Sequence, residues 1–202
     1  MAKDLFTIGY SGFPEVQDFI EELKHHGVEI LIDVRSSPYS AYYPQYNRDQ
    51  LTLKLKAAGI YYVNYAKQFG ARQEIESYYR NGRLDFEVFS HAEPFLEGVR
   101  NVEKSSASIA FMCAEKHPSE CHRAILVAKA FSDRGHRITH IKPDGVTLSQ
   151  HDIDNELLET YFPDRAQASL FDEDNRSEQE YIDLAYKLRN DEIGFRLEDL
   201  QT

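Results

Sequence analysis

Glu29-Ile30-Leu31-Ile32-Asp33-Val34-Arg35 is the stretch that decides the fold. Its apolar side chains follow one another instead of alternating with polar ones, which is typical of a strand in a parallel sheet covered on both faces. Other short apolar runs predict four further strands, over residues 5–9, 60–63, 107–113 and 137–141.

Helical patterns alternate with these strands. A helix that begins at Pro14 carries apolar residues at a period of 3.6 and ends at Gly27. Further helices are predicted over residues 49–58, 86–103, 118–134, 151–162 and 178–190, and Pro94 is a position where one of them can break. Because alternating strands and helices favour a parallel sheet with crossover connections, we predict an α/β fold. It has three layers, with a mostly parallel five-stranded sheet, helices on both faces and a C-terminal helical tail.

Composition divides the chain into an α/β domain over residues 1–162, an acidic linker over 163–176, and a C-terminal helix and tail over 177–202. The net charge of −11 belongs to the end of the chain, because residues 144–202 hold 16 acidic and 5 basic residues while the remainder is balanced. Residues 35–83, by contrast, carry eight Lys or Arg against three acids, together with nine of the thirteen tyrosines. Cations beside aromatic rings are the combination that binds single-stranded nucleic acid, although ordinary packing also uses tyrosines.

The composition also narrows the class of protein. The apolar runs are too short to span a bilayer, and the N-terminus shows no signal-peptide pattern. Two cysteines do not make a disulfide framework. We therefore expect a cytoplasmic protein with no membrane partner.

Polar side chains follow several of the predicted strands where the strands end. In an open parallel sheet ligands bind beyond the carboxyl ends of the strands, so these residues are candidates for one site. The alternative is that they are polar simply because they lie in loops, which are generally polar. The candidates are Tyr10, Ser11, Asp33, Arg35, Ser36, Cys113, Glu115, Lys116 and His140. Asp33 and Arg35 start on the same face of a strand and either serve a substrate or form an internal ion pair.

The densest group of reactive side chains lies between Cys113 and Arg123, at a turn from a strand into a helix. Backbone N–H groups at such a turn favour an anion, which Arg123 would also contact, and would lower the pKa of Cys113 if it faces them. His122 or His140 would act as a general acid or base. Cys121 shares a helical face with apolar residues, so we interpret it as a buried small hydrophobe.

A zinc site would have suitable ligands in Cys113, His117, Cys121 or His122, but their spacing matches none of the usual structural pairs. We therefore predict no cofactor and no metal ligand, with zinc left as the alternative. The expected catalytic residues are Asp33, Arg35, Cys113, Glu115, Lys116 and His122. The expected substrate-binding residues are Tyr10, Ser11, Ser37, Tyr46, Asn47, Arg123 and His140.

Together these motifs resemble the bacterial domain of unknown function 488 family, in the family order from about residue 5 to residue 160. The stretches that carry the resemblance are Thr7-Ile8-Gly9-Tyr10-Ser11, Leu31-Ile32-Asp33-Val34-Arg35-Ser36-Ser37-Pro38, Pro44-Gln45-Tyr46-Asn47, and Cys113-Ala114-Glu115-Lys116 with Pro118 and Cys121-His122-Arg123. The resemblance implies a shared α/β fold and a site at these motifs, and it brings little chemistry with it. The residues of this chain that match the family's characteristic loop and turn are Tyr10, Asp33, Arg35, Ser37, Pro38, Asn47, Cys113, Glu115, Lys116, Cys121, His122 and Arg123.

A weaker resemblance is to rhodanese-like domains, in which an Asp-Val-Arg strand precedes a later strand that ends in cysteine. Here the loop after Cys113 does not close as a short anion cradle ending in Arg, because the first arginine is Arg123. Sulfur transfer is therefore not expected.

The tail carries a pentapeptide, Gln167-Ala168-Ser169-Leu170-Phe171. It resembles the motif by which bacterial DNA polymerases and repair proteins bind the sliding clamp, with Ala168 where leucine is usual. Gln167, Leu170 and Phe171 would contact the clamp, unless Leu170 and Phe171 pin the tail to the domain's own core.

Three functions remain open from the sequence. The first is a hydrolase or lyase for DNA repair or processing, which acts on single-stranded or damaged nucleic acid and is tethered to the sliding clamp. The second is a cysteine-dependent small-molecule enzyme with Cys113 as nucleophile and an anion site at the Cys113–Arg123 turn. The third is a non-catalytic binding module.

Overall fold

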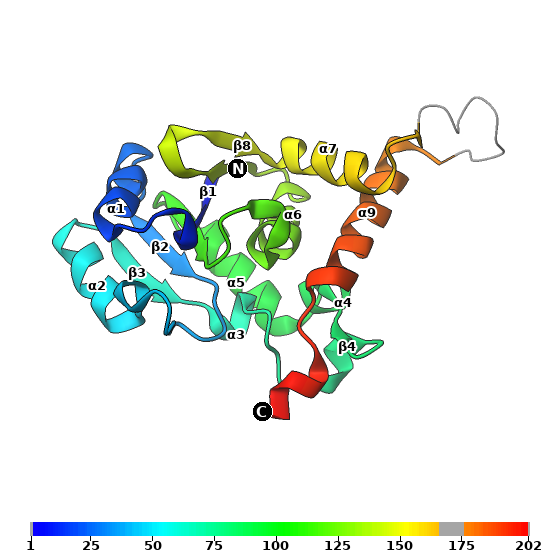
Figure 1. Ribbon diagram of the computed structural model, residues 1–202, viewed down its shortest axis with the longest axis horizontal. Helices are drawn as coiled ribbons and strands as arrows, with labels where there is room; N and C mark the ends of the chain where they lie inside the picture. Colours follow the sequence, from blue (N-terminus) through cyan, green and yellow to red (C-terminus); the bar gives the residue numbers. More distant parts are fainter. Residues whose placement is uncertain (1, 166–175, 202) are drawn as a thin grey trace.

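The computed structural model describes residues 2–165 and 176–201. In these residues one sheet has six strands, in the order β3-β2-β6-β1-β7-β8 (Figure 1). All neighbouring strands are parallel except β7 and β8. The strands are β1 Asp4–Gly9, β2 Ile30–Asp33, β3 Tyr61–Asn64, β6 Ile109–Cys113, β7 Arg137–Ile141 and β8 Thr147–Ser149.

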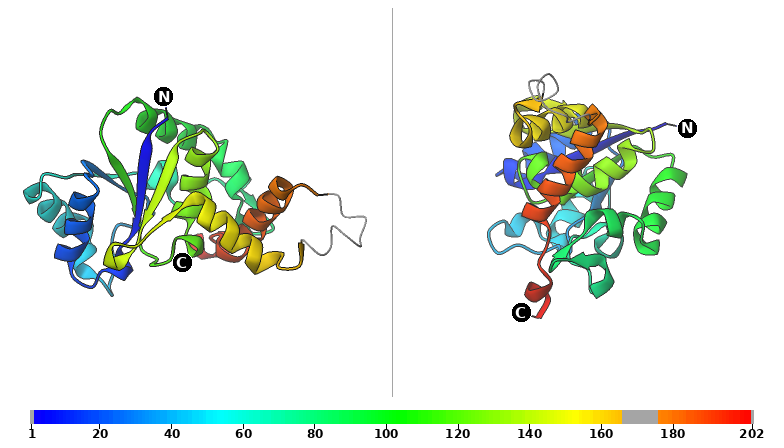
Figure 2. Two further views of the ribbon diagram at one scale, coloured as in Figure 1. Left: turned by 90° about the horizontal axis from the view of Figure 1, so that it is seen from above. Right: turned by 90° about the vertical axis from the view of Figure 1, so that its right-hand side faces the viewer.

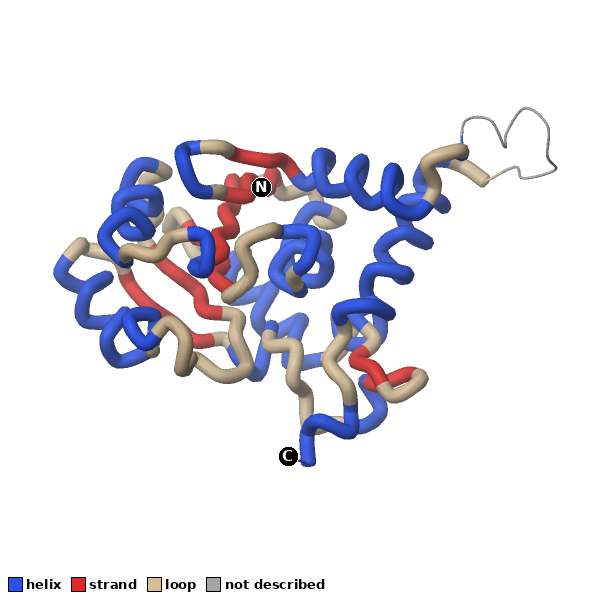
Figure 3. The backbone as a smooth tube through the Cα atoms, viewed as in Figure 1, coloured by secondary structure: helices blue, strands red, loops and turns tan. Residues whose placement is uncertain are grey.

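The sheet is covered on both faces because successive buried side chains of its strands enter two different cores. In β6, Phe111 packs in one core, and its neighbours Ala110 and Met112 pack in the other. Helices α1 Val16–His25 and α2 Arg48–Ala57 cover one face. The other face is covered by α4 Phe86–Ser90, α5 Glu93–Lys104 and α6 Lys129–Ser132. The predicted three-layer α/β fold is confirmed, and Figure 3 shows its strands lying between the helices.

Several elements differ from the prediction. Strand β8 adds a sixth, antiparallel strand at the edge of the sheet, and residues 79–84 form a small hairpin of β4 Tyr79–Arg80 and β5 Arg83–Leu84. The helix predicted over 86–103 breaks into α4 and α5, since Pro94 lacks an N–H and suits the first turn of a new helix. The helix predicted over 118–134 begins as a 3-10 turn over Pro118–Glu120 and continues as a π-helical segment, Arg123–Ala128, before α6.

The C-terminal helices pack at one end of the molecule, away from α1 and α2 (Figure 2). Helix α7 spans Gln150–Tyr161, and helix α9 spans Glu178–Ile193. Both reach the core on the α5 face, through side chains that include Ile153 and Tyr186. In the described residues no helix is long and apolar enough to cross a membrane.

The strand order creates a crevice at the carboxyl edge of the sheet. Strand β6 lies between β1 and β2. The chain leaves β1 and β2 toward helices on one face, but it leaves β6 toward the helical turn on the opposite face. Neighbouring loops therefore diverge there, which is the place where α/β sheets bind ligands.

Candidate functional site

A cleft of about 350 Å³ opens at this edge of the sheet. Its walls come from the ends of β1, β2 and β6, from the loops after β2 and α3 (Ala66–Phe69), and from the segment after α9. The lining residues are Tyr10, Arg35, Ser36, Ser37, Tyr39, Ser40, Ala71, Arg72, Cys113, Ala114, Glu115, Glu120, Cys121, His122, Ile193 and Phe195. A larger hollow of about 520 Å³ beside α1 is lined by Asp18, Glu21, Glu22 and their neighbours, and none of the candidate residues that the structure describes lines it.

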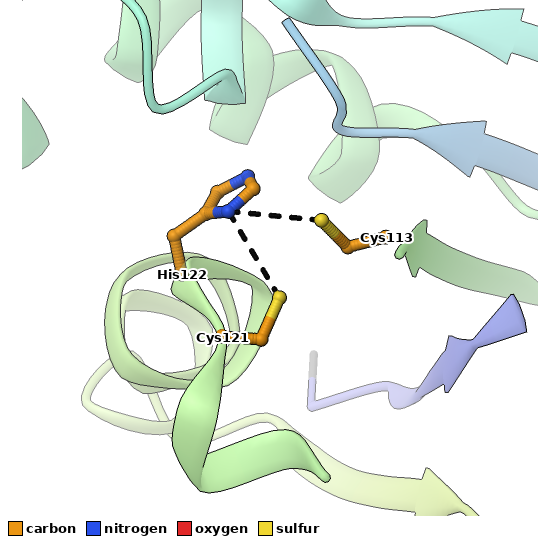
Figure 4. Close-up of side chains that lie close together, drawn as sticks. All are labelled: Cys113, Cys121 and His122. Atoms are coloured by element: carbon orange, nitrogen blue, oxygen red, sulfur yellow. Dashed lines mark hydrogen bonds between the residues drawn. The ribbon is translucent and has the colours of Figure 1, made fainter. Parts of the chain in front are cut away.

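Two cysteines and a histidine meet at the floor of the cleft (Figure 4). Cys113 is the last residue of β6, and the 3-10 turn at Pro118–Glu120 brings Cys121 and His122 back beside it. His122 Nδ1 lies 3.7 Å from Cys113 Sγ and 3.9 Å from Cys121 Sγ. Both cysteines are free and buried, whereas His122 is partly exposed.

Glu115 completes this cluster. The Cys121 thiol donates to Glu115 Oε2 at 2.8 Å. Burial of the carboxyl group and its closeness to Cys121 raise the pKa of Glu115 to about 7, although other parts of the side chain are exposed. The cluster therefore holds a group that exchanges a proton near neutral pH.

The two thiols differ in their electrostatic surroundings. Burial, together with the neighbouring Cys121 and Glu115, raises the pKa of Cys113 well above its usual value. Burial also opposes ionisation of Cys121, but the Cys113 thiol, the Arg123 guanidinium and His122 outweigh it and lower the pKa of Cys121. The lowered pKa expected of Cys113 thus belongs to Cys121, which does more than fill space as a small hydrophobe.

Arg123 fixes the turn that carries these groups. Its buried guanidinium donates to the Glu115 carbonyl at 2.6 Å and to the Lys116 carbonyl at 3.3 Å. Gly9 lets β1 approach the same turn, since a Cβ at Gly9 would lie 1.8 Å from the Glu115 carbonyl oxygen. Arg123 therefore positions the cluster from beneath instead of lining the cleft.

Arg35 reaches the cleft from the end of β2. Its guanidinium donates to both carboxylate oxygens of buried Asp33, at 2.6 to 3.0 Å, and to the Tyr46 carbonyl at 2.9 Å. Its carbon Cζ lies 5.0 Å from the centre of the Tyr10 ring. In the described residues its buried Nη1 has no hydrogen-bond partner. Arg35 thus forms the internal ion pair and keeps one hydrogen-bond donor unused.

The structure brings six of the predicted site residues to the cleft: Tyr10, Arg35, Ser37, Cys113, Glu115 and His122. The others lie nearby without lining it. Tyr46 is buried and donates to the Phe13 carbonyl, and Asn47 accepts from the Ser40 N–H. Ser11 donates its N–H to the Ala114 carbonyl, and Lys116 is exposed on the far side of the turn, near Gly12.

His140 is sealed beneath the site. Its Nδ1 lies 2.7 Å from Thr7 Oγ1 and its Nε2 lies 3.0 Å from Gln150 Oε1, and the residue is fully buried. His117 also lies apart from the cysteines and pairs with Ser119 at 2.9 Å. Gln167, Leu170 and Phe171, predicted to contact a partner, lie outside the described residues.

The cleft also contains residues that the sequence analysis did not select. Arg72 lies over the ring of Phe195, at 4.8 Å from its centre. Phe195 and Ile193 come from the tail, and their position depends on long-range packing that no local pattern reveals. Tyr39 and Arg72 belong to the basic, tyrosine-rich stretch, which was the only signal in the sequence that included them.

A family model described as "Domain of unknown function DUF488" matches residues 15–130. The chain belongs to this family. The match to DUF488 includes β2, β6 and the whole Cys113–Arg123 turn, and it leaves out Tyr10 and the tail residues of the cleft. The family therefore accounts for the reactive cluster, while the tail wall lies beyond the matched region. No curated protein and no solved structure matches the chain.

Proposed function

We propose that this DUF488 protein is an enzyme that processes single-stranded nucleic acid, with its chemistry at the Cys113, Glu115, Cys121 and His122 cluster. The observation that carries the proposal is the composition of one cleft. Its lining combines the reactive groups with exposed Tyr39 and Arg72 and partly exposed Phe195, which we call the rim. Such a rim is suited to a phosphate backbone that carries exposed bases.

The rim supplies two kinds of contact that a single nucleic-acid strand needs, an aromatic ring for its bases and a positive charge for its phosphates. Tyr39 is 49% exposed, and because the Arg48 guanidinium lies over its ring at 5.5 Å from the centre, a base would stack on the opposite face. Arg72 is exposed and would contact the phosphates, and Arg35, which also lines the cleft, adds a second positive charge. Base stacking on an aromatic ring is worth about 1–3 kcal/mol, so a few such contacts give measurable binding.

Binding of a fluorescent single-stranded oligonucleotide, measured by anisotropy at increasing salt, tests the proposal. We expect binding at low salt that weakens as salt rises, because counterions are released from the phosphates. Tyr39→Ala and Arg72→Ala should each weaken binding by about 10-fold. Tyr61→Ala and Lys56→Ala are the matched controls, because both residues are exposed and neither lines the cleft.

Absence of binding at low salt would refute the proposal, as would equal losses in the cleft and control variants. Activity is then read as a change in strand length or base composition after incubation. Glu115→Gln should abolish this change while binding persists, because it removes the proton-exchanging group and leaves the rim intact.

A second candidate is a cysteine-dependent enzyme that acts on a small anionic molecule. The size of the cleft favours it, since about 350 Å³ falls in the range of small-molecule pockets. This candidate would be favoured by two results together. Cys113 or Cys121 is alkylated rapidly in the folded protein, and the same protein does not bind oligonucleotides.

Tethering to the bacterial sliding clamp through Gln167, Leu170 and Phe171 is part of the first proposal and is supported by the sequence motif. The proposed compartment is the cytoplasm, where two free thiols remain reduced.

A further inference from the structure

The three side chains of the cysteine–histidine cluster are close enough together to hold one metal ion. Cys113 Sγ, Cys121 Sγ and His122 Nδ1 all lie within 4.8 Å of one another. In a tetrahedral zinc site, Zn–S and Zn–N bonds of usual length place sulfur and nitrogen ligands about 3.6 Å apart. The two distances here, 3.7 and 3.9 Å, match that separation.

The orientation of His122 supports the same interpretation. Its Nε2 lies 3.0 Å from the Val34 carbonyl oxygen, which can only accept, so the ring carries its proton on Nε2. Nδ1 faces both sulfur atoms (Figure 4), and in this tautomer of the neutral ring its lone pair is available to a metal ion between them. A backbone carbonyl is one of the common outer-shell partners that accept a hydrogen bond from the other ring nitrogen of a zinc-ligating histidine.

We propose that Cys113, Cys121 and His122 bind one zinc ion at the floor of the cleft. Two thiolates and one imidazole favour zinc over magnesium or calcium, which prefer oxygen ligands. Three protein ligands leave the fourth position for water or substrate, which is the arrangement of catalytic zinc sites. Zinc would supply a bound water of lowered pKa.

Glu115 takes a separate place in this arrangement. In the described residues no carboxylate joins the three mutually close ligand atoms. Glu115 Oε2 lies 2.8 Å from Cys121 Sγ, beside the ligands and along the same cleft. We assign Glu115 to contact with the substrate or with the water bound at the fourth zinc position. Glu115 is not itself a zinc ligand.

The spacing of Cys113, Cys121 and His122 in the sequence does not reveal a zinc site. Cys113 ends a strand, and the other two ligands are adjacent in the chain after a 3-10 turn. This pattern lacks the paired short spacings of structural zinc sites. Only the return of the turn to the end of β6 brings the three side chains together.

The zinc site lies in the cleft of the proposed function, but metal binding can be measured without nucleic acid. The full-length protein, purified with reductant from zinc-supplemented medium and dialysed against metal-free buffer, should contain about one zinc per chain by mass spectrometry of metals. Replacement by Co²⁺ should give thiolate-to-cobalt charge-transfer bands and the visible bands of tetrahedral cobalt. Either proposal can thus fail without the other.

Variants locate the ligands. Cys121→Ser and His122→Gln should each reduce zinc retention by at least about 10-fold. His117→Gln is the matched control, because this nearby histidine pairs with Ser119 outside the ligand set and should leave retention unchanged. Glu115→Gln should also retain zinc, and loss of zinc in that variant would overturn the three-ligand assignment.

The wild-type chain provides a test that does not depend on folding of the variants. Zinc-free protein that binds no Co²⁺ would overturn the proposal. An intact mass showing a Cys113–Cys121 disulfide under the same reducing conditions would also overturn it.

Discussion

Among single residues, Asp33 shows how a buried charge serves a site without entering it. It accepts three side-chain bonds from Arg35 and one from the Tyr62 hydroxyl, and it is fully shielded from solvent. Removing one partner of a buried pair leaves the other charge uncompensated, which costs more than the pair itself contributes. Asp33 is therefore a positioning residue for Arg35.

Asp33→Ala should lower the free energy of unfolding by about 3–5 kcal/mol, because Arg35 would remain charged and buried. Tyr62→Phe, which removes a single hydrogen bond to the same carboxylate, should cost only about 1 kcal/mol. Urea denaturation of both variants checks the difference. Equal costs would show that the ion pair does not stabilise the fold.

His140 couples stability to pH. Burial and the neighbouring Arg123 lower its pKa to about 3, from an ordinary value of 6.5. The unfolded chain therefore takes up this proton more readily than the folded one. The contribution of neutral His140 to the free energy of unfolding is fully present above pH 6.5. As the pH falls from 6.5 toward 3, this contribution decreases by about 1.4 kcal/mol per pH unit. His140→Asn should give a flatter profile between pH 6.5 and 4 in thermal unfolding, and parallel profiles would contradict this.

Residue types alone predicted much of the site. Arg35, Cys113 and Glu115 were predicted because reactive side chains follow the ends of strands, and His122 because it belongs to the dense group between Cys113 and Arg123; all four line the cleft. The roles of Arg123 and Cys121 were not predictable, because they depend on how a turn folds back. Arg123 was expected to contact substrate, and its guanidinium instead binds two carbonyls of its own turn.

Among the elements, helix α9 links the tail to the cleft. A chain of contacts runs from Thr7 in β1 through His140 and Gln150 to the Tyr186 hydroxyl, where Gln150 Nε2 donates at 2.6 Å. Asn190 donates to the Leu84 carbonyl at 2.8 Å and accepts from the Phe86 N–H at 2.9 Å. These bonds anchor the end of α9, from which the chain continues to the cleft wall.

Asn190→Ala should destabilise this anchor, because the buried Leu84 carbonyl and Phe86 N–H would each lose a partner at about 1–3 kcal/mol per group. Hydrogen exchange should accelerate in residues 190–197 and in the hairpin 79–84. Asp191→Ala, at the adjacent exposed position, is the control and should change neither. The same exchange rates in both variants would show that α9 is held by its apolar face alone.

Elements with a continuous apolar run or a clear helical period were predictable, and short ones were not. Strand β8 and the hairpin β4–β5 have three and two residues per strand, too few for a pattern. Both pair locally with the neighbouring strand, and the hairpin is also held by a distant residue, because Leu84 donates its N–H to the Phe195 carbonyl. Pro94 did mark the break between α4 and α5, because proline has a fixed place in a helix.

In the whole molecule, charge is separated along the chain. Residues 144–202 carry a net −11, while the rest of the chain is neutral and includes the basic stretch that borders the cleft. An acidic segment repels a phosphate backbone. The linker over residues 163–176, which carries the pentapeptide, is therefore suited to a protein partner, whereas the strand is proposed to bind in the cleft, so the two proposed contacts should be separable by mutation.

The double variant Leu170→Ala, Phe171→Ala should weaken capture by an immobilised bacterial sliding clamp by at least about 10-fold, because it removes two apolar side chains from the proposed contact. Oligonucleotide binding should not change in that variant, since Tyr39 and Arg72, the proposed contacts with the strand, are left intact. Ala168→Leu supplies the residue usual in the clamp-binding pentapeptide and should instead tighten capture. If the double alanine variant and Ala168→Leu both bind the clamp as the wild type does, or if neither variant nor the wild type binds it, the resemblance of residues 167–171 to that pentapeptide has no functional meaning here.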